Sequence, residues 1–206
     1  MHVHGLILAA GLSSRMGDFK PLMPLCGKTV IENSIDSMLL SGVERVVVVT
    51  GHRAQELEKV IHSRYLGETV ICTRNADYAT TDMMASIKIG LEAMPDCDAF
   101  FLLPGDMPTI QKETYLAVYQ TMLQTGNAIV FPALCGQRKH PPLISREMIG
   151  EILNYQGRGG LRELWKYHED KILAVPVDDE GCWTDIDTFE QYHRCVSRYQ
   201  SETIKS

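Results

Sequence analysis

The 206-residue sequence has no apolar run long enough to cross a membrane and no paired cysteines. No window approaches the ~18 uninterrupted apolar residues that a membrane-spanning helix needs. The opening Met-His-Val-His-Gly lacks the cationic start of a signal peptide, and the apolar run at residues 6–10 is too short for its core. The six cysteines are scattered without a C-x-x-C pair, so neither a zinc site nor a disulfide framework is indicated. We therefore expect a cytoplasmic protein with reduced thiols.

Basic residues are also scarce. Lysine and arginine number 20 against 26 acidic residues, which gives a net charge of −6, and no basic block occurs. Such a chain is a poor candidate for binding nucleic acid or an anionic membrane, although a local cationic pocket for a small anion is compatible with it. Apolar residues at 45% and charged residues at 22% exclude a disordered or fibrous chain. This length predicts a single domain, 1–206, with a disordered tail at 200–206.

Two hydrophobic periodicities alternate along the chain. Short apolar runs, such as the four consecutive valines within Arg45–Thr50, predict strands that are buried on both faces. Apolar residues spaced at i, i+4, i+7 and i+8 predict helices with one apolar face. The predicted strands are 3–9, 45–50, 68–73, 99–103, 128–131 and 172–177, and the predicted helices are 29–40, 54–65, 83–94, 112–123, 145–155, 161–168 and 189–199. The alternation predicts an α/β fold, a three-layer αβα sandwich with a mostly parallel, Rossmann-like sheet.

The loop after the first predicted strand concentrates groups that bind phosphate. It reads Leu-Ala-Ala-Gly-Leu-Ser-Ser-Arg-Met-Gly from residue 8 to residue 17, and Lys20 follows shortly afterwards. The small residues at its start let a ligand approach the backbone. The hydroxyls and the cations of Arg15 and Lys20 suit a polyphosphate. The segment is neither G-x-G-x-x-G nor a P-loop, so an ordinary glycine-containing surface loop is the alternative.

Carboxylates follow two other predicted strands. Asp106 lies in Pro-Gly-Asp-Met-Pro, directly after the strand at 99–103, and Asp185 and Asp187 precede the last predicted helix. Magnesium in proteins is held by one or two carboxylates together with substrate phosphates, so each carboxylate is a candidate metal ligand. The alternative is that Asp187 or Thr188 caps the last helix, and both roles are compatible. Ligands bind outside the carboxyl ends of strands in open α/β sheets, where all these groups are expected.

Taken together, these motifs resemble the nucleotidyltransferases that share the glycosyltransferase-A-type nucleotide-binding fold. Within them the chain is most similar to molybdenum-cofactor cytidylyltransferases and their molybdenum-hydroxylase accessory relatives. The shared segments are L-A-A-G-x-S-S-R-M-G with Lys-Pro-Leu, P-G-D-M-P, D-I-D-T, Gly51-His52, T-R-N-A at 73–76, M-A-S-I-K around Ser86 and H-P-P-L-I at 140–144. The resemblance extends from residue 5 to about residue 195.

The resemblance implies a Mg²⁺-dependent transfer of CMP from CTP to the phosphate of a molybdopterin-type cofactor, with release of pyrophosphate. It implies Lys20, Arg15 and Asp106 as catalytic residues, and Asp106, Asp187 and Asp185 as metal ligands. The nucleotide-binding residues that it implies are Leu8, Ala9, Ala10, Gly11, Ser13, Arg15, Lys20, Asn75, Ser86, Pro104 and Gly105. His140 and Lys139 would bind the acceptor, and a client molybdenum hydroxylase is the implied protein partner.

Several features leave alternatives open. Ala10 stands where the guanylyl branch of the family usually has glycine, which favours CTP over GTP. Asp82 and Lys139 each stand where the family usually has glycine, and Phe189 stands where the family has proline after D-x-D-T. Because Asp82 and Lys139 alter the surroundings of the acceptor, a sugar or alcohol phosphate is an alternative acceptor. A nonenzymatic, cofactor-carrying chaperone for a molybdenum hydroxylase is an alternative of another class, which the intact Lys20, Asp106 and Asp187 disfavour.

Overall fold

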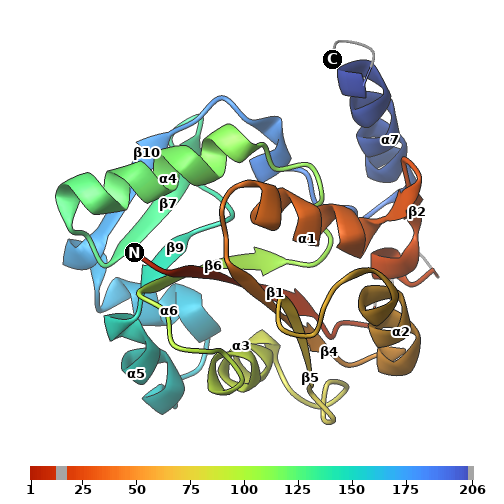
Figure 1. Ribbon diagram of the computed structural model, residues 1–206. Helices are drawn as coiled ribbons and strands as arrows, with labels where there is room; N and C mark the ends of the chain where they lie inside the picture. Colours follow the sequence, from red (N-terminus) through yellow and green to blue (C-terminus); the bar gives the residue numbers. More distant parts are fainter. Residues whose placement is uncertain (13–17, 204–206) are drawn as a thin grey trace.

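Parallel strands form the centre of the molecule, and helices cover both of their faces (Figure 1). The structure is a computed structural model that describes residues 1–12 and 18–203. Its eight-stranded sheet has the order β10-β7-β9-β6-β1-β4-β5, with β8 paired to β7. The strands of this sheet are β1 (Val3–Ala9), β4 (Arg45–Thr50), β5 (Val70–Arg74), β6 (Ala99–Pro104), β7 (Ile129–Leu134), β8 (Gln137–Arg138), β9 (Leu143–Ser145) and β10 (Ile172–Pro176).

The helices and short elements connect these strands. The helices are α1 (Val30–Leu40), α2 (Ala54–Arg64), α3 (Met83–Glu92), α4 (Lys112–Thr125), α5 (Glu147–Asn154), α6 (Gly160–Lys166) and α7 (Phe189–Thr203). Three short 3-10 helices, η1 (Lys20–Leu22), η2 (Glu169–Lys171) and η3 (Glu180–Cys182), and a small hairpin of β2 (Pro24–Leu25) and β3 (Lys28–Thr29) complete the described structure. Among the described residues, no helix has the length and apolar character needed to cross a membrane.

Alternate residues of each central strand point to opposite faces of the sheet, and each face carries its own apolar core. In β4, Val46 and Val48 pack into the core under α1, α2 and α4, whereas Val47 and Val49 pack into the core under α3, α5 and α6. All four valines are fully buried. This double burial explains the uninterrupted apolar run and confirms the predicted three-layer α/β fold with a mostly parallel sheet.

Some elements differ from the sequence-based expectation. The strand β9 has only three residues, too few for a recognisable period, and it pairs antiparallel with both β6 and β7. The strand β7 continues through Pro132 to Leu134, because proline lacks only the N–H donor and its carbonyl still accepts a bond from the Lys139 N–H at 2.8 Å. The sequence also predicts that the last helix ends at residue 199, whereas α7 continues to Thr203.

The chain reverses its direction of winding across the sheet between β1 and β6. From β1 it moves outward to β4 and β5, and it then returns to place β6 on the other side of β1. Both neighbours run parallel to β1, so the carboxyl ends of all three strands meet at one edge. In open α/β sheets such a switch point leaves a crevice for a ligand.

Two helical glycines test how closely the helices pack on the sheet. A Cβ on Gly90 of α3 would lie 2.3 Å from Leu6 Cδ1 and 2.8 Å from Val49 Cγ2, whereas a Cβ on Gly150 of α5 would meet no atom within 4 Å. We expect Gly90→Ala to lower the free energy of unfolding by about 1–2 kcal/mol, because overpacking outweighs the better helix propensity of alanine. Gly150→Ala should raise it by up to about 1 kcal/mol. Urea denaturation measures both, and equal shifts in the same direction would contradict the close packing of α3.

Candidate functional site

A cavity of about 410 Å³ opens at the switch point, outside the carboxyl ends of β1 and β6. Most of the residues that the sequence implicates in nucleotide or metal binding line it, namely Leu8, Ala9, Ala10, Gly11, Lys20, Ser86, Pro104, Gly105, Asp106 and Asp187. Ser13 and Arg15 lie outside the described residues. The structure thus brings together side chains and backbone from β1, η1, α3, the end of β6 and the segment before α7.

Small residues bring the backbones close together at this edge. The N–H of Gly105 donates to the carbonyl of Leu8 at 2.9 Å, and a Cβ on Gly105 would lie 3.1 Å from both that carbonyl oxygen and Ala9 Cβ. A Cβ on Gly51 would lie 2.7 Å from the carbonyl oxygen of Ala10. The strand ends can therefore approach one another only where these positions lack a side chain, which explains the glycines of the P-G-D and Gly-His motifs.

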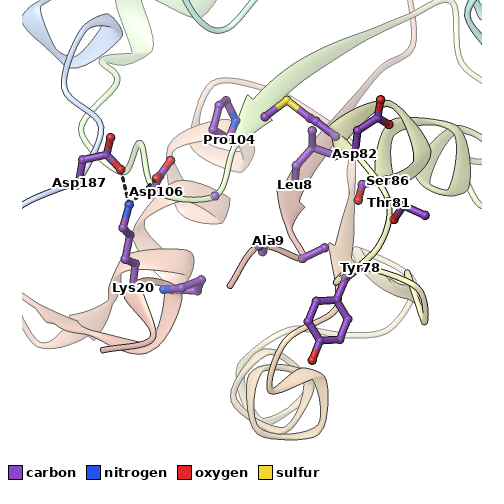
Figure 2. A pocket seen from close by; sticks show the side chains of 15 residues that line it. Leu8, Ala9, Lys20, Tyr78, Thr81, Asp82, Ser86, Pro104, Asp106 and Asp187 are labelled. Carbon is purple, nitrogen blue, oxygen red and sulfur yellow. Dashed lines mark hydrogen bonds and ion pairs between the residues drawn. The ribbon is translucent and has the colours of Figure 1, made fainter. Parts of the chain in front are cut away.

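Lys20 joins the two acidic segments on one side of the cavity (Figure 2). Its side chain is buried, and its Nζ lies 2.5 Å from Asp187 Oδ1 and 3.4 Å from Asp106 Oδ2. Burial raises the pKa of Asp106 above its ordinary value, the nearby ammonium of Lys20 opposes this shift, and the charge of Asp185 adds to it. Lys20 therefore balances the formal charge of one of these two carboxylates.

The polar residues Asp185, Asp187 and Thr188, directly before α7, make different contacts. Thr188 Oγ1 accepts a bond from the Gln191 N–H at 3.2 Å, and the Gln191 side-chain oxygen accepts one from the Asp187 N–H at 2.9 Å. Thr188 is therefore the residue that caps this helix, and the Asp187 carboxylate faces Lys20 instead. Asp185 turns toward α7, where its Oδ1 accepts a bond from Gln191 Nε2 at 3.3 Å. Of the two candidate carboxylates, Asp187 is the one that shares a cation with Asp106.

Asp179 fixes the two acidic segments relative to each other. This carboxylate is 2% exposed and accepts bonds, all of 2.8 Å, from the Gln111 N–H, the Thr114 hydroxyl and the Gly181 N–H. Gln111 directly precedes α4 and follows the segment that carries Asp106, and Gly181 lies in η3, shortly before Asp185. The bond from the Ile186 N–H to the Asp106 carbonyl, 3.1 Å, adds a second tie between the segments.

The opposite side of the cavity is formed by α3 and the loop that precedes it. Asn75 is buried, and its Nδ2 donates to Thr81 Oγ1 and Ser86 Oγ, each at 3.0 Å. It does not line the cavity and instead holds two hydroxyl-bearing residues that do. Asp82 accepts a bond from the Ala85 N–H at 3.1 Å and caps α3.

Sequence reasoning singles out Asp82 only as a replacement of a usual glycine, and it misses four other residues of the lining: Pro21, Tyr78, Thr81 and Met83. The Thr-Thr-Asp preceding α3 is a recognisable helix-start signal that could have directed attention to Thr81 and Met83. Tyr78 stands in a turn-rich segment with no periodicity, so no local signal marks it.

The two predicted acceptor residues occupy different places. His140 lines a second cavity of about 780 Å³, which shares Asp82 and Met83 with the first. Lys139 lines neither cavity, and its Nζ lies 3.2 Å from the centre of the Trp183 ring, a cation–π contact. Of the two residues, only His140 therefore lines the second cavity.

The acidic cluster fits a divalent cation that is shared with phosphate. No group of three or more histidine, cysteine or acidic side chains able to hold a metal occurs in the described part of the chain. Asp106 and Asp187, however, converge on a single cation, the Lys20 ammonium. Two carboxylates completed by substrate oxygens and water are the ligand set that magnesium prefers at phosphate-binding sites.

Comparisons with known proteins agree with this geometry. The family model described as "MobA-like NTP transferase domain" matches residues 5–172. The chain is 29% identical over 195 residues to the molybdenum cofactor cytidylyltransferase of Escherichia coli K12, covering 94% of this chain and 95% of that protein. It is 25% identical over 194 residues to a probable molybdenum cofactor guanylyltransferase of Bacillus cereus AH187, covering 91% of this chain and 92% of that protein. The solved structure of a nucleotidyl transferase from Methanothermobacter thermautotroptrophicus superposes with a TM-score of 0.79 at 25% identity, covering 97% of this chain and 98% of that chain.

Replacing Asp179 tests its part in this architecture. Asp179→Ala leaves three buried or half-buried donors without their acceptor, so we expect the free energy of unfolding to fall by about 3 kcal/mol. Asp178→Ala is the matched control, because the neighbouring Asp178 is exposed and makes no hydrogen bond or ion pair within the described residues. The control should change stability by less than about 0.5 kcal/mol. Guanidinium denaturation of both variants makes the comparison, and equal losses would contradict the proposed tie.

Proposed function

Because the chain belongs to the MobA-like NTP transferase domain family, it is a nucleotidyltransferase, and we propose that it transfers CMP from CTP to the phosphate of a molybdopterin-type cofactor. The observation that supports the nucleotidyl transfer most directly is the convergence of Lys20, Asp106 and Asp187 at the cavity beside β1 and β6. The similarity over nearly the whole length to a molybdenum cofactor cytidylyltransferase supports the choice of substrates.

The proposed pose follows from the lining of the first cavity. The base and ribose lie against the backbone of residues 8–11 and the hydroxyl of Ser86, where small residues permit close approach. The triphosphate extends toward Lys20, and Arg15, which lies outside the described residues, would contribute a second cation. Ala10, which lines this cavity, stands where the guanylyl branch of the family usually has glycine, and this supports CTP over GTP as the donor.

The chemistry requires positioning and charge neutralisation from this chain. An oxygen of the acceptor phosphate attacks the α-phosphorus of CTP, a new P–O bond forms, and the bond to the bridging oxygen breaks as pyrophosphate leaves. The acceptor phosphate is already anionic at neutral pH, so no general base is needed. Lys20 stabilises the negative charge that develops on the transferred and departing groups. Asp106 and Asp187 would hold a Mg²⁺ ion, which would supply further neutralisation of the phosphate oxygens.

The same cluster weighs against a purely carrying role. A chaperone that only delivers a finished cofactor needs a binding surface, but it does not need a buried lysine between two carboxylates. Burying the charged ammonium group of a lysine costs desolvation free energy, so its presence here favours a role in the reaction. A client molybdenum hydroxylase remains part of the proposal as the recipient of the product.

A pyrophosphate-release assay tests the reaction. We expect release with CTP and Mg²⁺ only when molybdenum cofactor is present, and at least about tenfold less with GTP, ATP or UTP, a difference of about 1.4 kcal/mol in the transition state. Release of pyrophosphate with GTP and with no other nucleotide would identify GTP, and not CTP, as the donor. Tight binding of the cofactor without turnover of any nucleotide would reject the enzymatic proposal in favour of the carrier.

Substitutions in the acidic cluster test the proposed roles. Asp106→Asn and Lys20→Met should each lower kcat by about 100-fold or more, since each removes a group that neutralises phosphate charge. Asp98→Asn, at the other end of β6, and Lys59→Met, on the exposed face of α2, are matched controls that should retain activity within about twofold. Circular dichroism verifies folding. Wild-type turnover in Asp106→Asn would contradict its assignment as a metal ligand.

A further inference from the structure

Gly51 and His52, which directly follow β4, contact the wall of the first cavity from outside it. The His52 N–H donates to the carbonyl of Ala10 at 3.2 Å. A Cβ on Gly51 would lie 2.8 Å from Tyr78 Cβ, so the backbone of this turn also packs closely against Tyr78. Ala10 and Tyr78 both line the cavity, whereas His52 is not part of the lining that the described residues form.

Three rings form a row at this edge of the sheet, which we call the aromatic row: Phe19, His52 and Tyr78. The centroid of the His52 ring lies 5.5 Å from that of Phe19, with the ring planes at 76°, and 6.0 Å from that of Tyr78, with the planes at 56°. Favourable edge-to-face and tilted contacts have centroid separations of roughly 4.5–7 Å. His52 is therefore the central ring of the row and contacts both of the others.

The aromatic row crosses the end of the sheet from one apolar core to the other. Phe19 is 4% exposed and belongs to the core under α1, α2 and α4, and it directly precedes Lys20. Tyr78 packs against the core under α3, α5 and α6. Figure 2 shows Lys20 and Tyr78 on the two sides of Ala9. His52 thus connects the side of the cavity that holds Lys20 with the side that holds Tyr78.

The two ends of the aromatic row differ in how firmly they are held without His52. Phe19 is buried, the guanidinium carbon of Arg53 lies 5.3 Å from its ring centroid, and the adjacent Lys20 is fixed by two ion pairs. Tyr78 is half-buried in the turns between β5 and α3, outside any helix or strand. Loss of the His52 ring should therefore release Tyr78 and leave Lys20 in place.

We propose that His52 is a positioning residue for the nucleotide: its ring holds Tyr78 as a wall of the first cavity, and the nucleoside of CTP packs against this wall. The inference rests on the proposed function, since it assumes that CTP occupies this cavity. His52 acts through Tyr78 and not by contact with the nucleotide. The aromatic row requires a ring at position 52, and a ring without nitrogen atoms serves equally well.

A double-mutant cycle on CTP binding tests whether His52 acts through Tyr78. Equilibrium titration of the full chain with CTP and Mg²⁺ measures the Kd of each variant. We expect Tyr78→Ala to raise this Kd about tenfold and His52→Ala about fivefold, as for the loss of one aromatic contact. The double variant should bind CTP like Tyr78→Ala, within about twofold, whereas independent effects would multiply to about fiftyfold.

Two further variants separate ring packing from other effects. His52→Phe keeps a ring between Phe19 and Tyr78 and should bind CTP within about twofold of the wild type. His62→Ala removes an exposed histidine of α2 outside the aromatic row and should do the same. In steady-state kinetics, His52→Ala should raise the KM for CTP and lower kcat by less than about threefold, because Lys20 keeps its ion pairs.

Hydrogen–deuterium exchange tests the positioning of Tyr78 in the absence of nucleotide. The N–H groups of Thr80 and Thr81 both donate to the carbonyl of Asp77 at 3.0 Å, in the turns that carry Tyr78. In His52→Ala these two amides should exchange at least about threefold faster than in the wild type, and in His52→Phe at the wild-type rate. Unchanged exchange in β1 and β4 verifies that the variants fold.

Wild-type CTP affinity in His52→Ala, independent effects in the double variant, or unchanged exchange at Thr80 and Thr81 would overturn the inference. Failure of His52→Phe to restore CTP binding would overturn it as well. These results are distinct from a failure of the proposed reaction. The expected pattern of Kd values without CMP transfer to molybdenum cofactor would reject the reaction and leave the role of His52 intact. CMP transfer with an unchanged KM for CTP in His52→Ala would reject that role and leave the reaction intact.

Discussion

The site depends on one buried ammonium group that two carboxylates share. Lys20, Asp106 and Asp187 come from three distant parts of the chain, and their contact holds η1, the end of β6 and the segment before α7 together. An unpaired charge at this depth is costly, so loss of any partner affects the other two.

The backbone around the cluster leaves little freedom to place these charges differently. The sheet is clamped between two apolar cores, and Gly105 and Gly51 permit the strand ends to approach β1 closely. Asp179 then ties η3 to the start of α4, so that both acidic segments are fixed to the same rigid body. Charge stabilisation of a phosphoryl transition state is most effective when the charges need no rearrangement. The geometry of this edge thus depends also on Gly51 and Asp179, which do not line the cavity.

Local sequence signals predicted the layers of the fold and the edge that carries the site. The consecutive valines of β4 predicted a strand buried on both faces. The tendency of ligands to bind outside the carboxyl ends of parallel strands predicted that residues 8–11 and Asp106 lie at one edge of the sheet. The choice between Asp185 and Asp187 had no such signal, because it depends on which side chain Gln191 engages. The packing of Lys139 on Trp183 is likewise a contact between distant segments, and β9 is too short to show a period. Tertiary contacts, and not local propensities, determine these features.

The two cavities are built from different parts of the chain. The first is formed mainly by backbone and small residues of β1 and β6, which leave little scope for variation without disturbing the sheet. The second takes part of its lining from β8 and α6, where Arg138 and Arg162 are exposed, and part from buried side chains such as Leu102 and Phe131. Substitutions at its exposed residues therefore change this cavity while the contacts of Lys20 stay unaltered. Asp82 and Met83 are the exceptions, because they line both cavities and any change in them alters both.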